Sequence, residues 1–201
     1  MRCSRNASST ASVPSDPSFG DIVRNVTFAA VIVRRAQQQD LDELARGYAA
    51  VAEEGFLGGQ PPVDLDDRVE RFRDLLARGD PAALWVLQDD DGQVVGHAAV
   101  QESVGGVLSL GMAIVAAARG QGGGRALVQA AQEHARSCGA HKISLEVWTD
   151  NAHAIGLYAV TGFEVEGLRR DHYRRRDGRL RSTLIMAWRA DQPKITGGST
   201  G

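Results

Sequence analysis

The chain has 201 residues, of which 43% are hydrophobic and 24% charged, and a formal net charge of −2 at pH 7. Its length suffices for one domain with a substantial core, and its charge gives no reason to expect a nucleic acid or a membrane surface as partner. The two cysteines, Cys3 and Cys138, are too few for a disulfide framework or a metal-binding cluster, and no apolar run approaches the roughly 18 residues of a membrane span, so we expect a cytoplasmic protein without a metal.

Both ends of the chain are polar. Residues 1–27 are rich in Ser, Ala, Asn and Pro, which is typical of a disordered leader. Residues 191–201 have a similar composition and are expected to form a disordered tail. Residues 28–190 are therefore expected to make one domain.

The first half of this domain predicts a strand, two helices and three strands. Asp40 can cap the first helix, in which Leu41, Leu44 and Tyr48 share one face. The run Asp89-Asp90-Asp91-Gly92 indicates a hairpin turn between two strands. In chain order, we expect a strand at 26–34, helices at 41–53 and 64–77, and strands at 83–88, 94–101 and 108–115.

The second half alternates between helices and strands. We expect a helix at 126–137, a strand at 142–148, a helix at 151–161 and strands at 164–170 and 183–188. Together with the antiparallel first half, this order predicts an α/β (α+β) fold, with a mixed sheet of about seven strands flanked by about four helices.

A glycine-rich turn links the strand at 108–115 to the helix at 126–137, with the sequence Arg119-Gly120-Gln121-Gly122-Gly123-Gly124-Arg125. Without Cβ atoms the backbone can lie close to a ligand, and unpaired N–H groups at the start of a helix favour an anion such as a pyrophosphate. The turn lacks the Gly-Lys-Ser/Thr of a P-loop, and Arg125 stands where a dinucleotide fingerprint needs its third glycine. The pattern alone also allows glycines that merely permit close packing of the helix on the sheet.

Two further residues could carry chemistry. Alternation in the strand at 142–148 places Glu146 and Trp148 on one face, which is typical of a solvated strand surface and also of a general base beside a pocket. In the next helix, Asn151, Ala154 and Tyr158 share an inward face, which fits either a core tyrosine or a tyrosine with a free hydroxyl at a site.

These segments together resemble the GNAT superfamily of N-acetyltransferases. The resemblance rests on Leu110 to Val115, the glycine-rich turn, Leu145-Glu146-Val147 with Asn151, Ala154 and Leu157-Tyr158, and Gly162-Phe163-Glu164. It extends from about Val31 to Trp188.

The resemblance implies acetyl-CoA as donor and a sheet splayed between its fourth and fifth strands. It assigns Tyr158 as the acid that protonates the departing thiolate and Glu146 as the base that deprotonates the amine, directly or through water. A backbone N–H near Ile114 would polarise the thioester carbonyl. The residues that it assigns to acetyl-CoA are Met112, Ala113, Ile114, Arg119, Gly120, Gln121, Gly122, Gly123, Gly124, Arg125 and Asn151.

The chain departs from the family pattern at Gly123, where a branched apolar residue is usual. The acceptor is expected to contact residues 54–63, the strand around His97, and residues 169–181, where seven arginines could steer an acidic acceptor or could simply belong to a solvated hairpin. His97 is an alternative base, and His134 is expected at the surface. The acceptor remains open between a small-molecule amine or amino acid and a peptide N-terminus. A non-catalytic acetyl-CoA sensor and a homodimer also remain open.

Overall fold

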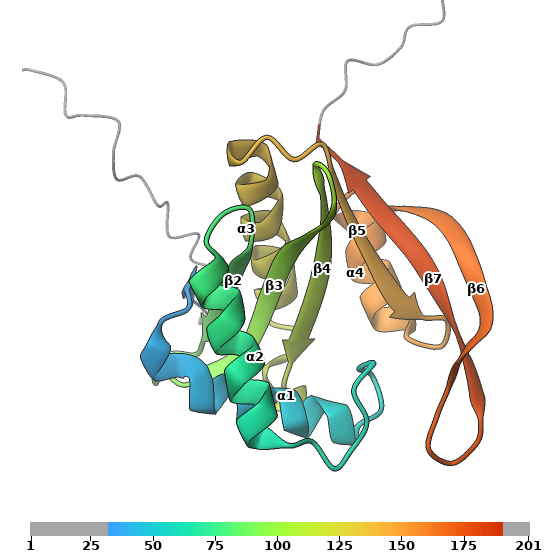
Figure 1. Cartoon of the computed structure of the whole chain (residues 1–201), viewed down its shortest axis with the longest axis horizontal. Helices are drawn as coiled ribbons and strands as arrows, with labels where there is room; N and C mark the ends of the chain where they lie inside the picture. Colours follow the sequence, from blue (N-terminus) through green and yellow to red (C-terminus); the bar gives the residue numbers. More distant parts are fainter. Residues whose placement is uncertain (1–31, 191–201) are drawn as a thin grey trace, which may run out of the picture.

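The computed structural model describes residues 32–190, which form a seven-stranded mixed sheet and four α-helices (Figure 1). The expected leader, the expected tail and most of the first expected strand lie outside these residues. None of the described helices is long and apolar enough to cross a membrane. In chain order the elements are β1 (Ile32–Arg35), α1 (Leu41–Glu53), α2 (Leu65–Arg78), β2 (Ala83–Gln88), β3 (Val94–Val104), β4 (Val107–Ile114), α3 (Gly123–Ser137), β5 (Lys142–Trp148), α4 (Ala152–Val160), β6 (Glu164–Arg174) and β7 (Leu180–Arg189).

The strand order is β1-β2-β3-β4-β5-β7-β6. All neighbouring strands are antiparallel except β4 and β5, which are parallel. The β4–β5 pairing extends only from Val107–Lys142 to Ser109–Ser144, after which the two strands separate. The expected mixed fold and the splay between the fourth and fifth strands are therefore confirmed.

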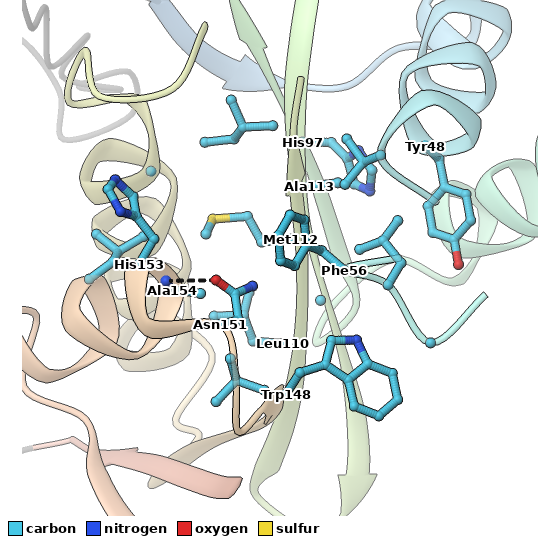
Figure 2. Close-up of a pocket in the computed structure, with 18 of the residues that line it drawn as sticks. Tyr48, Phe56, His97, Leu110, Met112, Ala113, Trp148, Asn151, His153 and Ala154 are labelled. Atoms are coloured by element: carbon cyan, nitrogen blue, oxygen red, sulfur yellow. Dashed lines mark hydrogen bonds between the residues drawn. The ribbon is translucent and has the colours of Figure 1, made fainter. Parts of the chain in front are cut away.

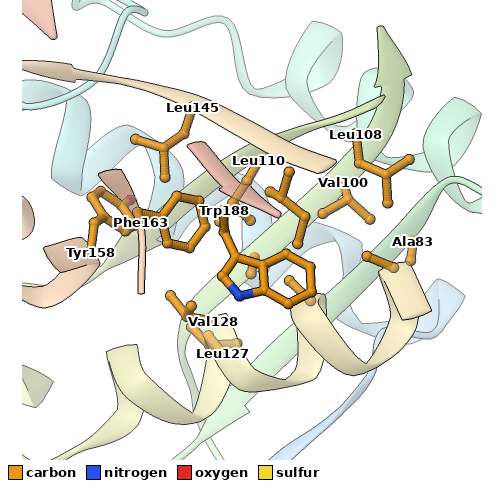
Figure 3. Close-up of a cluster of buried hydrophobic side chains, with 14 of the residues drawn as sticks. Ala83, Val100, Leu108, Leu110, Leu127, Val128, Leu145, Tyr158, Phe163 and Trp188 are labelled. Carbon is orange, nitrogen blue, oxygen red and sulfur yellow. The ribbon is translucent and has the colours of Figure 1, made fainter. Parts of the chain in front are cut away.

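Alternation along β2 divides the hydrophobic core between the two faces of the sheet. Leu84 and Val86 lie in one cluster with side chains from α1 and α2. Trp85 and Leu87 lie in the other, with side chains from α3, α4 and β5. Figure 3 shows part of this second cluster, where Trp188 of β7 lies beside Leu127 and Val128 of α3. The glycine-rich turn and α4 therefore approach the splay from one face, and α1 and α2 approach it from the other.

Asp40 does not cap α1 as the sequence predicted. Its carboxylate instead accepts two hydrogen bonds from the Arg34 guanidinium, both 2.8 Å long, and one of 2.7 Å from the backbone N–H of Gln37. The hydrogen bonds from Arg34 are the main reason that the pKa of Asp40 lies below its usual value. An ion pair therefore ties β1 to the start of α1.

His134 is also placed differently from its expected surface position. It is buried, with its Nε2 3.0 Å from the carbonyl oxygen of Pro81 and its ring 5.4 Å from the ring of Trp85. Its position on α3 faces the end of β2, so it packs between the helix and the sheet. A helical period alone did not distinguish this inner position from the solvated face.

The last hairpin is longer than its sequence pattern predicts. Between the pairs Arg169–Thr183 and Tyr173–Arg181, β6 advances four residues while β7 advances two, so β6 bulges. Asp171 takes a positive φ of 50° in this bulge, and its backbone N–H donates to the hydroxyl of Ser182. The bulge brings Tyr173 to the edge of the splay, where its hydroxyl meets Glu146.

Candidate active site

A cavity of about 970 Å³ occupies the splay between β4 and β5. Figure 2 shows Asn151, His153 and Ala154 on one side of it and Tyr48 and His97 on the other. The cavity is thus bounded by the glycine-rich turn and α4 at one end, and by α1 and α2 at the other. Of the residues that the sequence assigned to a site, those that line it are Met112, Ala113, Ile114, Arg119, Gly120, Gly122, Gly124, Arg125, Glu146, Asn151, Tyr158 and the alternative base His97.

The glycine-rich turn presents free backbone donors to this cavity. Gly120 and Gly122 have φ values of 79° and 87°, a conformation that a side chain would strain. Gly122 precedes the first residue of α3, so the helix begins inside the glycine run, three residues earlier than expected. Within residues 32–190, the N–H groups of residues 120–125 donate to no backbone carbonyl, whereas the N–H of Ala126 donates to Gly122. Such unpaired donors at a helix N-terminus suit an anion.

Two residues of the turn do not line the cavity. Gln121 is exposed, and its amide donates back to the carbonyl oxygen of Ala117 at 3.3 Å. Gly123 is buried against β2, where an added Cβ would lie only 2.5 Å from Cδ2 of Leu87. The space that a branched residue at position 123 would need is therefore filled by Leu87.

The Arg119 guanidinium is hydrogen-bonded to other groups of the chain and is not free to bind an anion in the turn. Its Nη1 and Nη2 donate to the Glu54 carboxylate at 2.6 and 2.8 Å, and its Nε donates to the carbonyl oxygen of Ile114 at 2.8 Å. The arginine thus links the end of α1, the end of β4 and the glycine-rich turn. Its role in this structure is to fix the turn.

Tyr158 lies on α4 with its ring in the core, 5.5 Å from the ring of Phe163 (Figure 3). Its side chain also lines the cavity, and its hydroxyl donates to no group among the hydrogen bonds of the described residues. Burial raises the pKa of Tyr158 to about 12. The phenol is therefore protonated at neutral pH and available as a donor.

Asn151 stands at the N-terminus of α4, where its Oδ1 accepts the backbone N–H of Ala154 at 3.1 Å (Figure 2). This capping bond fixes the orientation of the amide and leaves its NH₂ group for the cavity. Gly124 faces the same helix, since an added Cβ would lie 2.8 Å from Cδ2 of Leu157. The absence of a side chain at Gly124 therefore lets α3 and α4 approach each other beside the turn.

Glu146 lies on β5 and its carboxylate is held by three donors. Its Oε2 accepts from the hydroxyls of Tyr173 and Thr183, both at 2.8 Å, and its Oε1 lies 3.1 Å from the Arg169 guanidinium. Burial and then the bond to Glu146 raise the pKa of Tyr173. Glu146 is thus a fixed carboxylate on the cavity wall, next to a protonated phenol.

Arginines of the β6–β7 hairpin hold the loop between α1 and α2 over the cavity. Arg181 donates to the carbonyl oxygen of Gly55 at 2.6 Å, and Arg175 donates to those of Leu57 and Gly58 at 3.4 and 3.1 Å. The Arg176 side chain also donates to a carbonyl of this loop, that of Pro61, and its backbone N–H donates to the Gln60 side chain at 2.7 Å. These arginines are therefore structural in the present state and are not simply a solvated surface.

The same arginines bury Trp148, which alternation places on the same face of β5 as Glu146. The guanidinium carbons of Arg181 and Arg175 lie 4.2 and 5.4 Å from the centre of its ring. The ring of Tyr173 packs against it edge-on, at 5.3 Å. Trp148 and Tyr173 both line the cavity.

An aromatic cluster closes the opposite end, and of its three rings the sequence assigned only that of His97 to the acceptor site. The rings of Tyr48, Phe72 and His97 lie 5.1 to 6.4 Å apart, and all three line the cavity. Burial, with the nearby charge of Arg68, lowers the pKa of His97 to about 4, so the imidazole is neutral at pH 7. In the sequence, Arg68 lies three residues after Leu65 and four before Phe72, which places a charged residue on the apolar face of α2. This unusual position is the sequence pattern that could have indicated the cluster.

Comparison with known proteins agrees with this architecture. Residues 47–163 match the model of the acetyltransferase (GNAT) family. Over 141 residues the chain is 31% identical to the L-methionine sulfoximine/L-methionine sulfone acetyltransferase of Pseudomonas aeruginosa. The aligned region covers 67% of this chain and 81% of that protein.

Many solved structures have the same fold, and two of them illustrate the likeness. The ribosomal-protein-alanine N-acetyltransferase of Brucella melitensis has a TM-score of 0.70 and 27% identity, over 79% of this chain and 99% of that chain. A GNAT superfamily phosphinothricin acetyltransferase of Sinorhizobium meliloti, solved in complex with acetyl-CoA, has a TM-score of 0.68 and 22% identity, over 80% and 88% of the two chains. At this second identity the likeness concerns the fold alone.

Proposed function

The chain belongs to the GNAT family of acetyltransferases, and we propose that it transfers the acetyl group of acetyl-CoA to the amine of a small molecule. The observation that carries the acceptor class is the loop at residues 55–61, which hairpin arginines hold across the acceptor end of the cavity. A small acceptor fits inside this enclosure, whereas a protein N-terminus would need the loop to move. The relative that acts on methionine sulfoximine supports the same class.

The donor would be held by the backbone rather than by a set of charged side chains. The free N–H groups of residues 120–125 fit the pyrophosphate of acetyl-CoA, and Arg125, which lines the cavity beside them, adds a positive charge. The edge of β4 from Met112 to Ile114, left unpaired by the splay, offers backbone groups to the pantetheine arm. Asn151 would donate its free amide N–H to the same arm.

Bound acetyl-CoA supplies an activated acetyl thioester, and the chain would supply the proton transfers. The acceptor nitrogen attacks the carbonyl carbon, the C–S bond breaks, and the sulfur takes a proton from the Tyr158 hydroxyl. The proton that the nitrogen loses on becoming an amide restores this hydroxyl through water. Tyr158 suits this role because its phenol is protonated, faces the cavity and has no protein acceptor in the described chain. A backbone N–H near Ile114 would stabilise the negative charge on the carbonyl oxygen.

The incoming amine must lose a proton before it attacks, because an ammonium has no lone pair. We assign this proton to Glu146, directly or through water, because its carboxylate is the one acidic group on the described cavity wall. His97 is the alternative, since it is neutral at pH 7 and faces the same cavity. The two differ in position, because Glu146 lies on β5 and His97 on β3.

A peptide N-terminus is the second acceptor class. The fold similarity to a ribosomal-protein-alanine N-acetyltransferase at 27% identity favours it. It requires the loop at residues 55–61 to release the hairpin arginines when the peptide binds. Acetylation of short peptides in preference to free amines would support this class and contradict our proposal.

The experiment that tests the proposal is release of CoA from acetyl-CoA over a panel of amino acids, polyamines, aminoglycosides and short peptides. Thermal unfolding with acetyl-CoA, NADP⁺ and ATP is measured in parallel. We expect a rise in melting temperature with acetyl-CoA that exceeds the other two, and turnover with a small amine. Binding of acetyl-CoA without turnover on any amine would instead indicate a sensor domain.

A further inference from the structure

Arg68 is a positive charge inside the cavity without an acidic partner in the described part of the chain. It lies in the first turns of α2 and lines the acceptor end with Tyr48, Phe72 and His97. None of the ion pairs formed by residues 32–190 includes it, although most arginines in the same range have a carboxylate within 4 Å or a carbonyl acceptor. Its Nε is fully buried and has no hydrogen-bond partner among these residues.

A charged group with a buried, unpaired N–H raises the free energy of the folded protein unless another contact compensates for the lost hydration. A buried donor without an acceptor loses its hydrogen bonds to water, and the penalty is larger for a charged group. The face of Tyr48 compensates in part, since the guanidinium carbon lies 3.7 Å from the centre of that ring, and Phe72 lies farther away at 5.8 Å. Stacking also fixes the plane of the guanidinium, but it satisfies none of the N–H groups at its edge. The two Nη groups, which unlike Nε are not fully buried, remain available to an acceptor from outside the chain.

The other charged side chains of the cavity are already engaged or lie beside the turn. Arg119 is paired with Glu54, and Glu146 is paired with Arg169. Arg125 belongs to the first turn of α3, next to the proposed pyrophosphate site. Of the cationic side chains on the described cavity wall, Arg68 is thus the one that lies at the acceptor end without an ion-pair partner.

We propose that Arg68 binds the carboxylate of the acceptor, so that the preferred substrates are amines that also carry a carboxylate, as amino acids do. The planar guanidinium matches the two oxygens of a carboxylate, and a buried pair of this kind is stronger than one in water. The aromatic side chains of Tyr48 and Phe72 exclude water around it, and neutral His97 adds a polar contact without a competing charge. This inference rests on the proposed acetyl transfer to a small amine.

The assignment also changes the interpretation of the arginine-rich hairpin. The sequence left open whether the arginines of residues 169–181 steer an acidic acceptor or belong to a solvated hairpin. In the structure Arg175 and Arg181 donate to carbonyls of the loop at residues 55–61, and Arg169 is paired with Glu146. The residue that we expect to bind the anion is therefore Arg68, on the opposite side of the cavity, and not an arginine of the hairpin.

The test compares free amino acids with their primary amides, which keep the side chain and the amine but lack the negative charge. CoA release is measured for the twenty L-amino acids in both forms, with the wild type, Arg68→Gln and Arg68→Lys. We expect kcat/KM of the wild type to favour the acids by about 10- to 100-fold, the range typical of charged hydrogen bonds. Arg68→Gln removes this preference by raising KM for the acids, and leaves the amides and acetyl-CoA little changed. Arg68→Lys retains part of it.

Arg73→Gln is the matched control, since Arg73 lies on the same helix, pairs with Glu70 and does not line the cavity. It should keep the full preference for acids. The inference is wrong if the wild type does not favour acids, or if Arg68→Gln lowers turnover of acids and amides equally.

A binding measurement separates this inference from the proposed function. The melting temperature of the CoA-saturated protein is measured with each acid and each amide. If no amine is acetylated, the proposed transfer fails, and a rise in melting temperature with acids that Arg68→Gln removes still supports the carboxylate site. No rise with any acid refutes that site. An unchanged rise with acetyl-CoA in Arg68→Gln shows that the variant is folded.

Discussion

The packing of Gly123 on Leu87 predicts that a single added methyl group destabilises this protein. In Gly123→Ala the new Cβ would lie 2.5 Å from Cδ2 and 3.1 Å from Cδ1 of Leu87, whereas carbon atoms in contact prefer about 3.5–4.0 Å. Leu87 is fully buried, so it cannot move away without disturbing the core of α3 and β2. Overpacking of this kind costs about 1–3 kcal/mol. Alanine regains less than about 1 kcal/mol of helix propensity, because position 123 is the first residue of α3.

We therefore expect Gly123→Ala to lower the free energy of unfolding by about 1–2 kcal/mol, measured by urea denaturation with tryptophan fluorescence. A double-mutant cycle with Leu87→Ala tests the cause. Leu87→Ala alone should cost about 2–5 kcal/mol through the cavity that it leaves, and Gly123→Ala should then cost almost nothing, because both clashing atoms are gone.

Gly156→Ala is the matched control for the added methyl group. Gly156 lies within α4, and no atom stands within 4 Å of an added Cβ. This variant should therefore be as stable as the wild type or more stable, by up to about 1 kcal/mol. Equal stability of Gly123→Ala and the wild type, or costs of the two substitutions that add within about 0.5 kcal/mol, would refute the assigned packing.

Three further predictions concern the cavity. Tyr158→Phe should lower kcat by about 100-fold or more with little change in affinity for acetyl-CoA. The pKa of Tyr158 is about 12 in the folded protein, above its unfolded value of about 10, so its ionisation should cost neither rate nor stability below pH 9 and should destabilise the fold as the pH rises from about 10 to about 12. Glu146→Gln should depress the rate most at low pH, where the amine is protonated, and a loss of equal size at every pH would indicate that Glu146 only positions its neighbours. Arg181→Gln, which frees the carbonyl of Gly55, should raise KM for the acceptor by about 10-fold while KM for acetyl-CoA stays constant, and the reverse pattern would contradict the role of the loop.

Short-range patterns were sufficient for most elements of the fold. The bounds expected for α1, β2 and β5 agree with the structure, because helical and alternating periods reflect local burial. The end of the hairpin was less predictable, since the bulge at Asp171 depends on the pairing of β6 with β7. The start of α3 was also missed, because glycines with low helix propensity are held in the helix by packing on Leu87 and Leu157.

In the site as well, the sequence predicts residues that belong to local motifs but not contacts between distant segments. The glycine-rich turn and Tyr158 were predicted from the sequence because each is part of a local motif, and the structure places both on one cavity. The partners of Glu146 were not, because Tyr173, Thr183 and Arg169 reach it across strands that are distant in the sequence.

The sequence by itself determined the kind of fold, its family resemblance and the turn suited to the donor, because these depend on residue types at short spacings. Only the tertiary structure decided which charges are free. It engages the hairpin arginines with loop carbonyls and pairs Arg119 with Glu54. Among the described residues it leaves Arg68 stacked on Tyr48, with no ion pair and with Nε lacking a hydrogen-bond partner. The physical reason is that the interaction of a charge depends on its distance from other charges and on its burial, and both are set by contacts between segments far apart in the chain.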